Sequence, residues 1–391
     1  MNYNTVRKIL WAIIGITLII GAISIYYRVV NGHADTGNGS YMPWGLWVSQ
    51  YIYFISLSAG AFLISALVYV FGVKRLEPIG RLSLFTALVC LIASILHIWF
   101  DLGHSERFWY VYVYSNWSSL LNFMVWCYTI YFLVLLAELY FATKEKVWSI
   151  LKRVYTPESA ARDKRILKIL ASVGIPLAVF FHGGVGAVFG VLIARPYWHV
   201  GLYPILFLIA AIATGAAFLT FIVAYFPSKR EDKAGIVRFL GRFCLVFLII
   251  EIIYLFADFF QSLYQGLPQN QAAVNAVLFG PFWWTFWIVQ ILVGTMVPII
   301  LLAHPKLSQN IKVVGLACLI IVLGFSVARM NLVFPAMAVP ELEGLLTAFY
   351  DPRLTFSYVP SLMEWGLTIG IIGFAGLLFL IGYDKLKLEE K

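Results

Sequence analysis

The sequence predicts an all-α integral membrane protein of about ten transmembrane helices, for two reasons. Hydrophobic residues make up 62% of the 391-residue chain and charged residues only 12%, whereas a soluble domain typically carries about 25% charged residues. The mean hydropathy is +0.88, and long apolar runs recur along the whole sequence. A chain of this composition has too few charges to cover a water-facing surface of its size.

Each predicted helix is an apolar run of about 20 residues, the length needed to cross a bilayer. The first run follows Arg7 and Lys8, as the core of a signal peptide does, but it is long and no A-x-A-like cleavage site follows. We therefore expect it to remain as a helix. The ten predicted spans are residues 9–30, 46–72, 82–102, 121–142, 166–193, 201–226, 238–260, 281–303, 310–328 and 364–383.

The Lys and Arg residues predict the orientation of these helices. If both termini are cytoplasmic, all but five of the 28 Lys and Arg residues lie on the cytoplasmic side, which is the distribution that the positive-inside rule describes. This distribution also accounts for the net charge of +9 without a nucleic-acid partner. The five expected on the outer side are Arg28, Arg107, Arg195, Arg329 and Arg353.

The outer connections differ from the cytoplasmic ones in length and composition. Residues 31–45, 103–120, 261–280 and 329–363 are long, rich in aromatic residues, Gly, Asn and Pro, and poor in charge. Single aromatic residues there fit an interfacial belt. Their gathering on one face also fits a docking surface for an outer partner subunit.

Two stretches of the sequence resemble each other and predict an internal repeat. Gly60-AFLISALVY matches Gly215-AAFLTFIVAY, and each is followed by a helix that opens with Gly-Arg, at Gly80 and Gly241, and closes near an Asp. Parallel repeats of this kind place sites near the repeat interface. We expect an N-terminal helix and loop, two four-helix bundles and a C-terminal loop and helix, at residues 1–45, 46–200, 201–328 and 329–391.

Ionisable residues within the spans are candidates for function, because charge in hydrocarbon is unfavourable. His97 and Asp101 are four residues apart on one helix face and are suited to pass a proton; the alternative is a helix-end hydrogen bond that tethers the following loop. His182 precedes Gly183, Gly184 and Gly186, which let a flat ligand or another helix approach closely. A hydrogen bond to a neighbouring helix is the alternative role for His182.

Three more carboxylates are candidates for a proton path. Glu251 and Asp258 are seven residues apart, about two helical turns, and face the same way. Glu138 lies near the cytoplasmic end of its helix, where it either begins a proton path or reaches Lys144. Cys90, Cys127, Cys244 and Cys318 lie in four different apolar runs without any C-x-x-C, so the sequence carries no iron–sulfur or c-type haem motif.

Several short motifs, in this order and spacing, resemble the NrfD/polysulfide-reductase (PsrC) membrane-subunit family in its long, HybB-like form. They are Pro43-Trp-Gly-Leu-Trp47, Ser58-Ala-Gly-Ala61, Asp101-Leu-Gly followed by Glu106-Arg-Phe108, Phe181-His-Gly-Gly184 followed by Ala194-Arg-Pro-Tyr-Trp198, Glu251-Ile-Ile-Tyr254, and Tyr358-Val-Pro-Ser-Leu-Met-Glu364. The resemblance covers essentially the whole chain.

The resemblance implies the membrane subunit of a respiratory oxidoreductase in a prokaryotic cytoplasmic membrane. Such subunits bind menaquinone or ubiquinone near the outer face, hold no covalent redox cofactor or haem, and exchange electrons with a ferredoxin-like iron–sulfur subunit. That subunit connects to a catalytic partner, here most readily a molybdopterin enzyme, with a hydrogenase or a cytochrome as alternatives. By position, His182 with Gly183, Gln50 and Tyr53 is expected to contact the quinone. Asp101, with His97, is expected to exchange the proton, and Glu251 to relay protons from the deeper side.

Two other functions fit parts of the sequence. Repeats, charges within the spans and glycine-rich helices also suit a secondary transporter. A b-type cytochrome is the second alternative, because His97 and His182 supply two imidazoles for one haem.

Overall fold

The computed structural model describes residues 3–226, 232–342, 344–386 and 388. The described residues form helices joined by loops and turns, with no strand among them. In chain order the helices are α1 (Tyr3–Asn31), α2 (Leu46–Tyr69), η1 (Lys74–Ile79), α3 (Gly80–Asp101), η2 (Ser105–Arg107), α4 (Tyr110–Val113), α5 (Leu120–Ile150), α6 (Pro157–Gly190), α7 (Tyr203–Tyr225), α8 (Lys233–Tyr264), α9 (Pro268–Leu278), η3 (Thr285–Met296), α10 (Val297–Ala303), η4 (Leu307–Gln309), α11 (Ile311–Ala338), α12 (Leu345–Ala348) and α13 (Leu362–Lys385).

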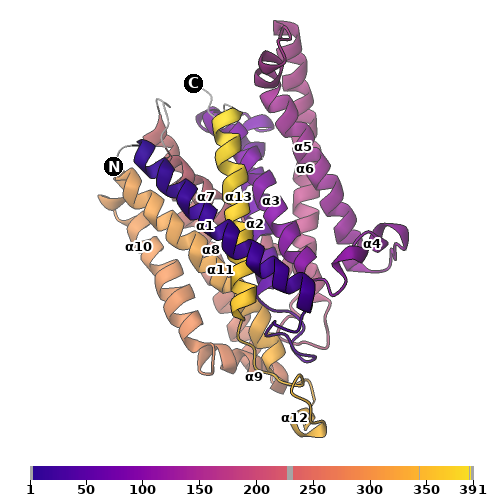
Figure 1. Cartoon of the computed structure of the whole chain (residues 1–391). Coiled ribbons are helices and arrows are strands. Elements are labelled where there is room, and N and C mark those ends of the chain that lie inside the picture. Colours follow the sequence, from indigo (N-terminus) through magenta and orange to yellow (C-terminus); the bar gives the residue numbers. More distant parts are fainter. Residues whose placement is uncertain (1–2, 227–231, 343, 387, 389–391) are drawn as a thin grey trace.

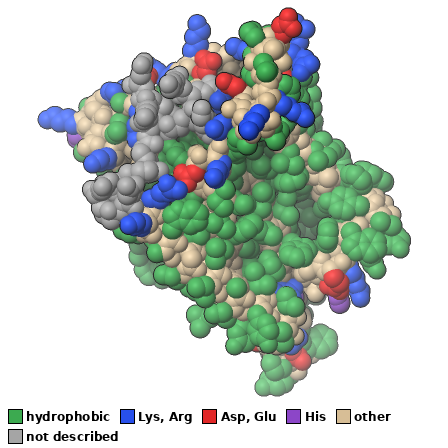
Figure 2. All heavy atoms as spheres, turned by 45° about the horizontal axis from the view of Figure 1, so that its top comes forward, with side chains coloured by type: hydrophobic (Ala, Val, Ile, Leu, Met, Phe, Trp, Pro, Cys, Tyr) green, Lys and Arg blue, Asp and Glu red, His purple; other side chains and the backbone are tan. Residues whose placement is uncertain are grey.

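Ten helical segments in the described part of the chain are long and apolar enough to cross a membrane. The predicted fold class is confirmed, and the chain is a multi-pass integral membrane protein. The two termini lie at the same end of the bundle (Figure 1), as an even number of spans requires. Figure 2 shows Lys and Arg side chains gathered at that end and a broad hydrophobic surface beside it. Of the basic residues expected there, Lys229, Arg230, Lys387 and Lys391 lie outside the described residues.

Three helices form the centre of the bundle. In the spans of α2, α3 and α7, 78%, 72% and 67% of the most apolar stretch is buried inside the protein, against 17% in α1 and in α8. The central helices are rich in Gly, Ala, Ser and Thr. These small residues let helices pack closely, which stabilises their association in lipid, where the hydrophobic effect does not drive helices together. The outward faces of α1 and α8 carry large exposed aliphatic residues, as lipid-facing helices do.

Gly60 and Gly215, the residues that begin the two matching stretches, face each other where α2 crosses α7. A Cβ atom at Gly60 would overlap Ala211 and Gly215, and one at Gly215 would overlap Gly60 and Ala61. Equivalent residues meet in this way at a two-fold axis between similar halves. The repeat itself and its bounds stay predictions.

The ninth predicted span was ten residues too short. We expected a helix over 310–328 with Arg329 in an outer loop, but α11 continues to Ala338 and carries Arg329 as a buried residue, 5% exposed. The apolar pattern resumes directly after Arg329, so the charge lies within the helix rather than at its end. Arg329 is therefore not one of the outer-side residues.

The fourth and fifth spans are also longer than predicted. α5 has 31 residues and α6 has 34, or roughly 46 and 51 Å at 1.5 Å per residue, whereas the hydrocarbon core is about 30 Å thick. The paired helices extend past the others at the end where the termini lie (Figure 1). The last turns of α5 and the first turns of α6 extend these helices beyond the length of a membrane span. The apolar pattern of the sequence does not predict these extensions.

Candidate functional site

A buried polar group lies where α2, α6, α7 and α11 meet. His182 on α6 is fully buried, and its Nε2 lies 2.8 Å from the carbonyl oxygen of Phe207 on α7 and 3.5 Å from Ser56 Oγ on α2. In a neutral ring, the bond to the carbonyl assigns the hydrogen to Nε2 and leaves Nδ1 as an acceptor. Nδ1 is buried without a hydrogen-bond partner among the described residues.

Arg329 also belongs to this junction, although the sequence predicted an outer loop for it. Its Nη2 donates to Ser56 Oγ at 3.4 Å, and the guanidinium lies 4.6 Å from the centre of the Phe207 ring. Its charge also acts on the carboxylate of Glu251 on α8. Because a buried cation is unfavourable without partners, the cation–π contact and the carboxylate stabilise Arg329 here. In the sequence, the apolar run that follows Arg329 was the feature that could have predicted its place inside a helix.

Nearly two helical turns before Ser56 on α2, Gln50 continues the contact between α2 and α11. The side chains of Gln50 and Ser326 exchange hydrogen bonds of 3.0 and 3.1 Å. Ser326 lies three residues before Arg329, so both face α2. Of the residues predicted to contact a quinone, the structure thus brings Gln50 and His182 to the same helix junction. Gly183 borders Pro204, and a Cβ there would meet no atom closer than 3.7 Å.

The histidine on α3 lies on the opposite side of α2. The His97 ring stacks on Phe54 at 5.2 Å, whereas Ser56 reaches His182. Residues two apart on a helix point about 200° apart, so α2 separates the two histidines, and one haem held between them is excluded. The ring of Tyr53 packs on Phe54, so this predicted quinone contact belongs to the His97 side.

The predicted pair of His97 and Asp101 shares a helix but no hydrogen bond. His97 Nδ1 instead lies 2.8 Å from the carbonyl oxygen of Ala93, while its Nε2 and Asp101 Oδ1 are buried without hydrogen-bond partners in the described ranges. Both groups therefore present a free acceptor atom. Both residues lie on α3, as their spacing predicted. The His97 imidazole, however, bonds to a carbonyl of the preceding turn of the same helix.

Asp101 belongs to a charged group at the C-terminal end of α3. Arg28 on α1 donates to the carbonyl oxygens of Phe100 and Leu102, at 2.9 and 2.6 Å, and its charge acts on Asp101. Arg28 Nη2 also lies 3.0 Å from His33 Nε2. Burial, and then the charge of Arg28, lower the pKa of His33 below its usual value of 6.5. These bonds join α1 to the backbone at the end of α3 and do not involve the Asp101 side chain.

Glu364 lies beside the same group and closes the loop before α13. Its carboxylate accepts hydrogen bonds from the Tyr358 hydroxyl, from Gly37 N at 2.8 Å and from Ser361 N at 2.9 Å. Burial and the neighbouring carboxylate raise the pKa of Tyr358. The motif Tyr358 to Glu364 therefore joins the loop before α13 to the loop before α2.

Glu138 does not reach Lys144, which corrects one of the two roles expected for it. Lys144 Nζ instead lies 2.9 Å from Asp163 Oδ1 on α6, with both side chains almost fully buried. Glu138 is fully buried and neither carboxylate oxygen has a hydrogen-bond partner within the described residues. Its place in a proton path stays a prediction.

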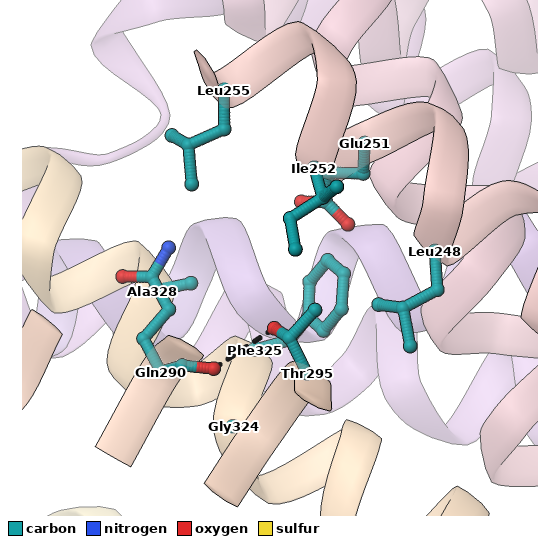
Figure 3. A pocket seen from close by; sticks show the side chains of 9 residues that line it. All are labelled: Leu248, Glu251, Ile252, Leu255, Gln290, Thr295, Gly324, Phe325 and Ala328. Carbon is teal, nitrogen blue, oxygen red and sulfur yellow. Dashed lines mark hydrogen bonds between the residues drawn. The ribbon is translucent and has the colours of Figure 1, made fainter. Parts of the chain in front are cut away.

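Glu251 borders a small cavity between α8, η3 and α11, with room for about 20 Å³ of water (Figure 3). Three polar side chains line it, namely Glu251, Gln290 and Thr295, together with apolar residues that include Leu248 and Phe325. Asp258, two turns along α8, is not part of the cavity lining. No cluster of three or more His, Cys, Asp or Glu residues suited to a metal occurs in the described part of the chain.

Comparison with known proteins agrees with this arrangement of helices. The family model described as "Polysulphide reductase, NrfD" matches residues 34–341. A selenate reductase subunit of Mesobacillus selenatarsenatis is 37% identical, over 98% of this chain and 95% of that protein. The Hdr-like menaquinol oxidoreductase integral membrane subunit of Archaeoglobus fulgidus is 27% identical, over 94% and 91%.

A third relative has a similar description. The menaquinone reductase integral membrane subunit of Nitratidesulfovibrio vulgaris is 26% identical, over 94% of this chain and 88% of that protein. All three relatives cover nearly the full length, and the family model covers well over half of the chain. With its ten membrane-crossing helices, this chain belongs to the NrfD family of polysulphide reductase membrane proteins.

Proposed function

We propose that this chain is the quinone-reactive membrane subunit of a respiratory oxidoreductase complex, in a prokaryotic cytoplasmic membrane with both termini cytoplasmic. The observation that carries the proposal is the pair of buried histidines. Each has one ring nitrogen bonded to a backbone carbonyl and the other without a partner among the described residues. A free imidazole nitrogen accepts a hydrogen bond or a proton from a hydroxyl group such as that of a quinol.

The residues at the central junction fit a quinone headgroup in their chemistry. His182 offers a free acceptor, Gln50 offers an amide, and Arg329 supplies a positive charge that stabilises developing negative charge on a nearby oxygen. Gly183 has space at its Cα. A bound quinone supplies two-electron redox chemistry together with the uptake or release of two protons. We assign His182 and Gln50 to hold the headgroup.

Asp101 and His97 have a different place in this proposal. Since α2 separates them from His182, they do not contact the same face of a headgroup, and we assign them to the release of protons at the outer end. Asp101 lies at the end of its helix, beside Arg28. Tyr53 lies on this side of α2 and is assigned with them.

An iron–sulfur subunit is the partner that we propose on the outer side. The outer loops expose large apolar side chains, among them Leu342, Leu346, Phe349 and Tyr350. This surface, which includes the projecting α12 (Figure 1), is apolar enough to dock a protein. Names of relatives that contain menaquinol or menaquinone support a quinone in the complex. The name selenate reductase supports a catalytic subunit, for which we propose a molybdopterin enzyme.

The test is to purify the complex from its native membrane, identify the co-purifying subunits and measure quinol oxidation. His182→Ala and Asp101→Asn should each lower the rate about 100-fold or more while the complex stays assembled. His304→Ala is the matched control, because His304 is exposed at the cytoplasmic end. A single polypeptide without iron–sulfur clusters and without a quinol response contradicts the proposal, and solute uptake by vesicles then tests the transporter.

A further inference from the structure

The cavity beside Glu251 lies away from the His182 group and has its own chemistry. Glu251 comes from α8, Gln290 and Thr295 from the π-helical segment η3, and Gly324, Phe325 and Ala328 from α11. Glu251 Oε2 is buried without a hydrogen-bond partner in the described residues. A buried carboxylate without partners is unfavourable, so the oxygen needs a proton or a hydrogen-bond donor.

The π-helical segment η3 forms one wall of this cavity. Thr295 Oγ1 donates to the Gln290 carbonyl at 2.9 Å, and Gln290 Oε1 accepts from Asn331 Nδ2 at 2.8 Å. These bonds fix Gln290 and Thr295 on the side of the cavity that faces Glu251 (Figure 3). Gly294 and Gly324 bring η3 and α11 into close contact next to it. The π-helix η3 has 12 residues, longer than the single π-helical turns that are frequent at functional sites.

The size and lining of the cavity favour water over a larger ligand. Ligand pockets for drug-sized molecules span about 300–1,000 Å³, whereas the room for water in this cavity is only about 20 Å³, little more than one buried water requires. A buried water needs two to four polar partners, which a carboxyl, an amide and a hydroxyl supply. An ordered water between Glu251 and Gln290 satisfies both groups.

Arg329 connects this cavity with the central junction. It lies on α11, like Gly324, Phe325 and Ala328 of the cavity wall, and it is the charged group that acts on Glu251. Its Nη2 contacts Ser56, which in turn contacts His182. Arg329 directly follows Ala328 of the cavity wall, and its guanidinium contacts Ser56 beside His182. A change in the charge of Glu251 therefore changes the electrostatic field at a cation that borders the His182 group.

We propose that the cavity holds water and that Glu251 stores one transferable proton there, with Arg329 coupling its charge to the His182 group. On loading, a hydronium ion gives its proton to the carboxylate and becomes water, and one negative charge beside Arg329 is removed. On unloading, the carboxylic acid returns the proton to water. The site is thus a proton store in the second half of the chain, separate from the proton release assigned to Asp101. The coupling to the quinone site rests on the proposed function, whereas the proton store does not.

The first test needs no enzymatic activity. Infrared spectra of the purified chain in detergent should show a protonated carboxyl band at a pH where exposed Glu side chains are ionised. Glu251→Gln should remove one component of that band, and the component should shift in D2O because water reaches it. The exposed Glu158→Gln is the matched control and should leave the band unchanged. Identical spectra for wild type and Glu251→Gln at every pH overturn the proposal.

The second test addresses the coupling. In the purified complex, Glu251→Gln fixes the neutral form and should make quinol oxidation less dependent on pH, without loss of bound subunits. Glu158→Gln should keep the wild-type pH profile. An unchanged profile in Glu251→Gln overturns the coupling. If the infrared component is present but no variant or wild-type complex oxidises quinol, the proposed function fails while the proton store stands.

Discussion

Arg329 on α11 donates from Nη2 to Ser56 Oγ on α2 across 3.4 Å, within the membrane-crossing part of the bundle. The contact links the two halves of the chain at the residue that also meets His182. A charge at this position influences both the His182 group and Glu251. The first prediction concerns this residue.

Arg329→Met should lower quinol oxidation about 100-fold, the scale of removing one preorganised electrostatic donor from a low-dielectric site. Arg329→Lys should recover only part of the rate, because an ammonium lacks the planar fork of a guanidinium. Steady-state rates of the purified complex check both variants. Full activity in Arg329→Met, with an intact complex, contradicts an electrostatic role.

Gly60→Val and Gly215→Val should each destabilise the protein, because a side chain at either position overlaps the backbone of the facing helix. Overpacking of a well-packed core typically costs about 1–3 kcal/mol, and a clash with backbone should reach the upper end. The thermal unfolding midpoint in detergent is the measurement. Gly15→Val is the control, since no atom lies within 4 Å of a Cβ there; equal midpoints for all three variants speak against the close crossing.

Asp163→Asn should destabilise the contact between the last turns of α5 and the first turns of α6, because it leaves the ammonium of Lys144 buried without its carboxylate. The two side chains are only 4% and 2% exposed, and breaking a buried pair costs about 3–5 kcal/mol. The double variant Lys144→Met with Asp163→Leu should recover most of the loss, because neither charge remains. Thermal unfolding of the single and double variants tests this, and a double variant as unstable as Asp163→Asn refutes it.

The pH dependence of stability should include a contribution from His33. Because burial and Arg28 lower its pKa in the folded protein, the unfolded chain binds the proton first as the pH falls. Stability should therefore be complete above pH 6.5, the usual value, and decrease as the pH falls from there to the folded pKa. His33→Asn should flatten this decrease in a series of thermal unfolding midpoints, whereas the exposed His304→Asn should not. If His33→Asn leaves the pH dependence of the unfolding midpoint unchanged, His33 does not cause the decrease in stability.

Much of the fold followed from the sequence alone, since apolar runs of spanning length are required by the bilayer itself. The number of spans is such a property, and the ten helices agree with it. The helix ends were less accurate. The predicted ninth span ended at residue 328 because Arg329 is charged. In the structure Arg329 lies within α11, because α2, α7 and α8 supply partners for its charge.

The candidate site, too, could be predicted from the sequence only in part. Residue type and spacing picked out His182 and Glu251, because polar groups are rare in apolar helices and stand out in a single sequence, whereas Gln50 came only from the resemblance to a known family. Which of them meet was decided only by tertiary structure. Spacing along α3 cannot reveal that α2 lies between His97 and His182, or that the His97 ring bonds to Ala93. Helical periodicity fixes which face a residue lies on, whereas the neighbour of that face is set by how the helices cross, and here that crossing depends on the contact of Gly60 with Gly215.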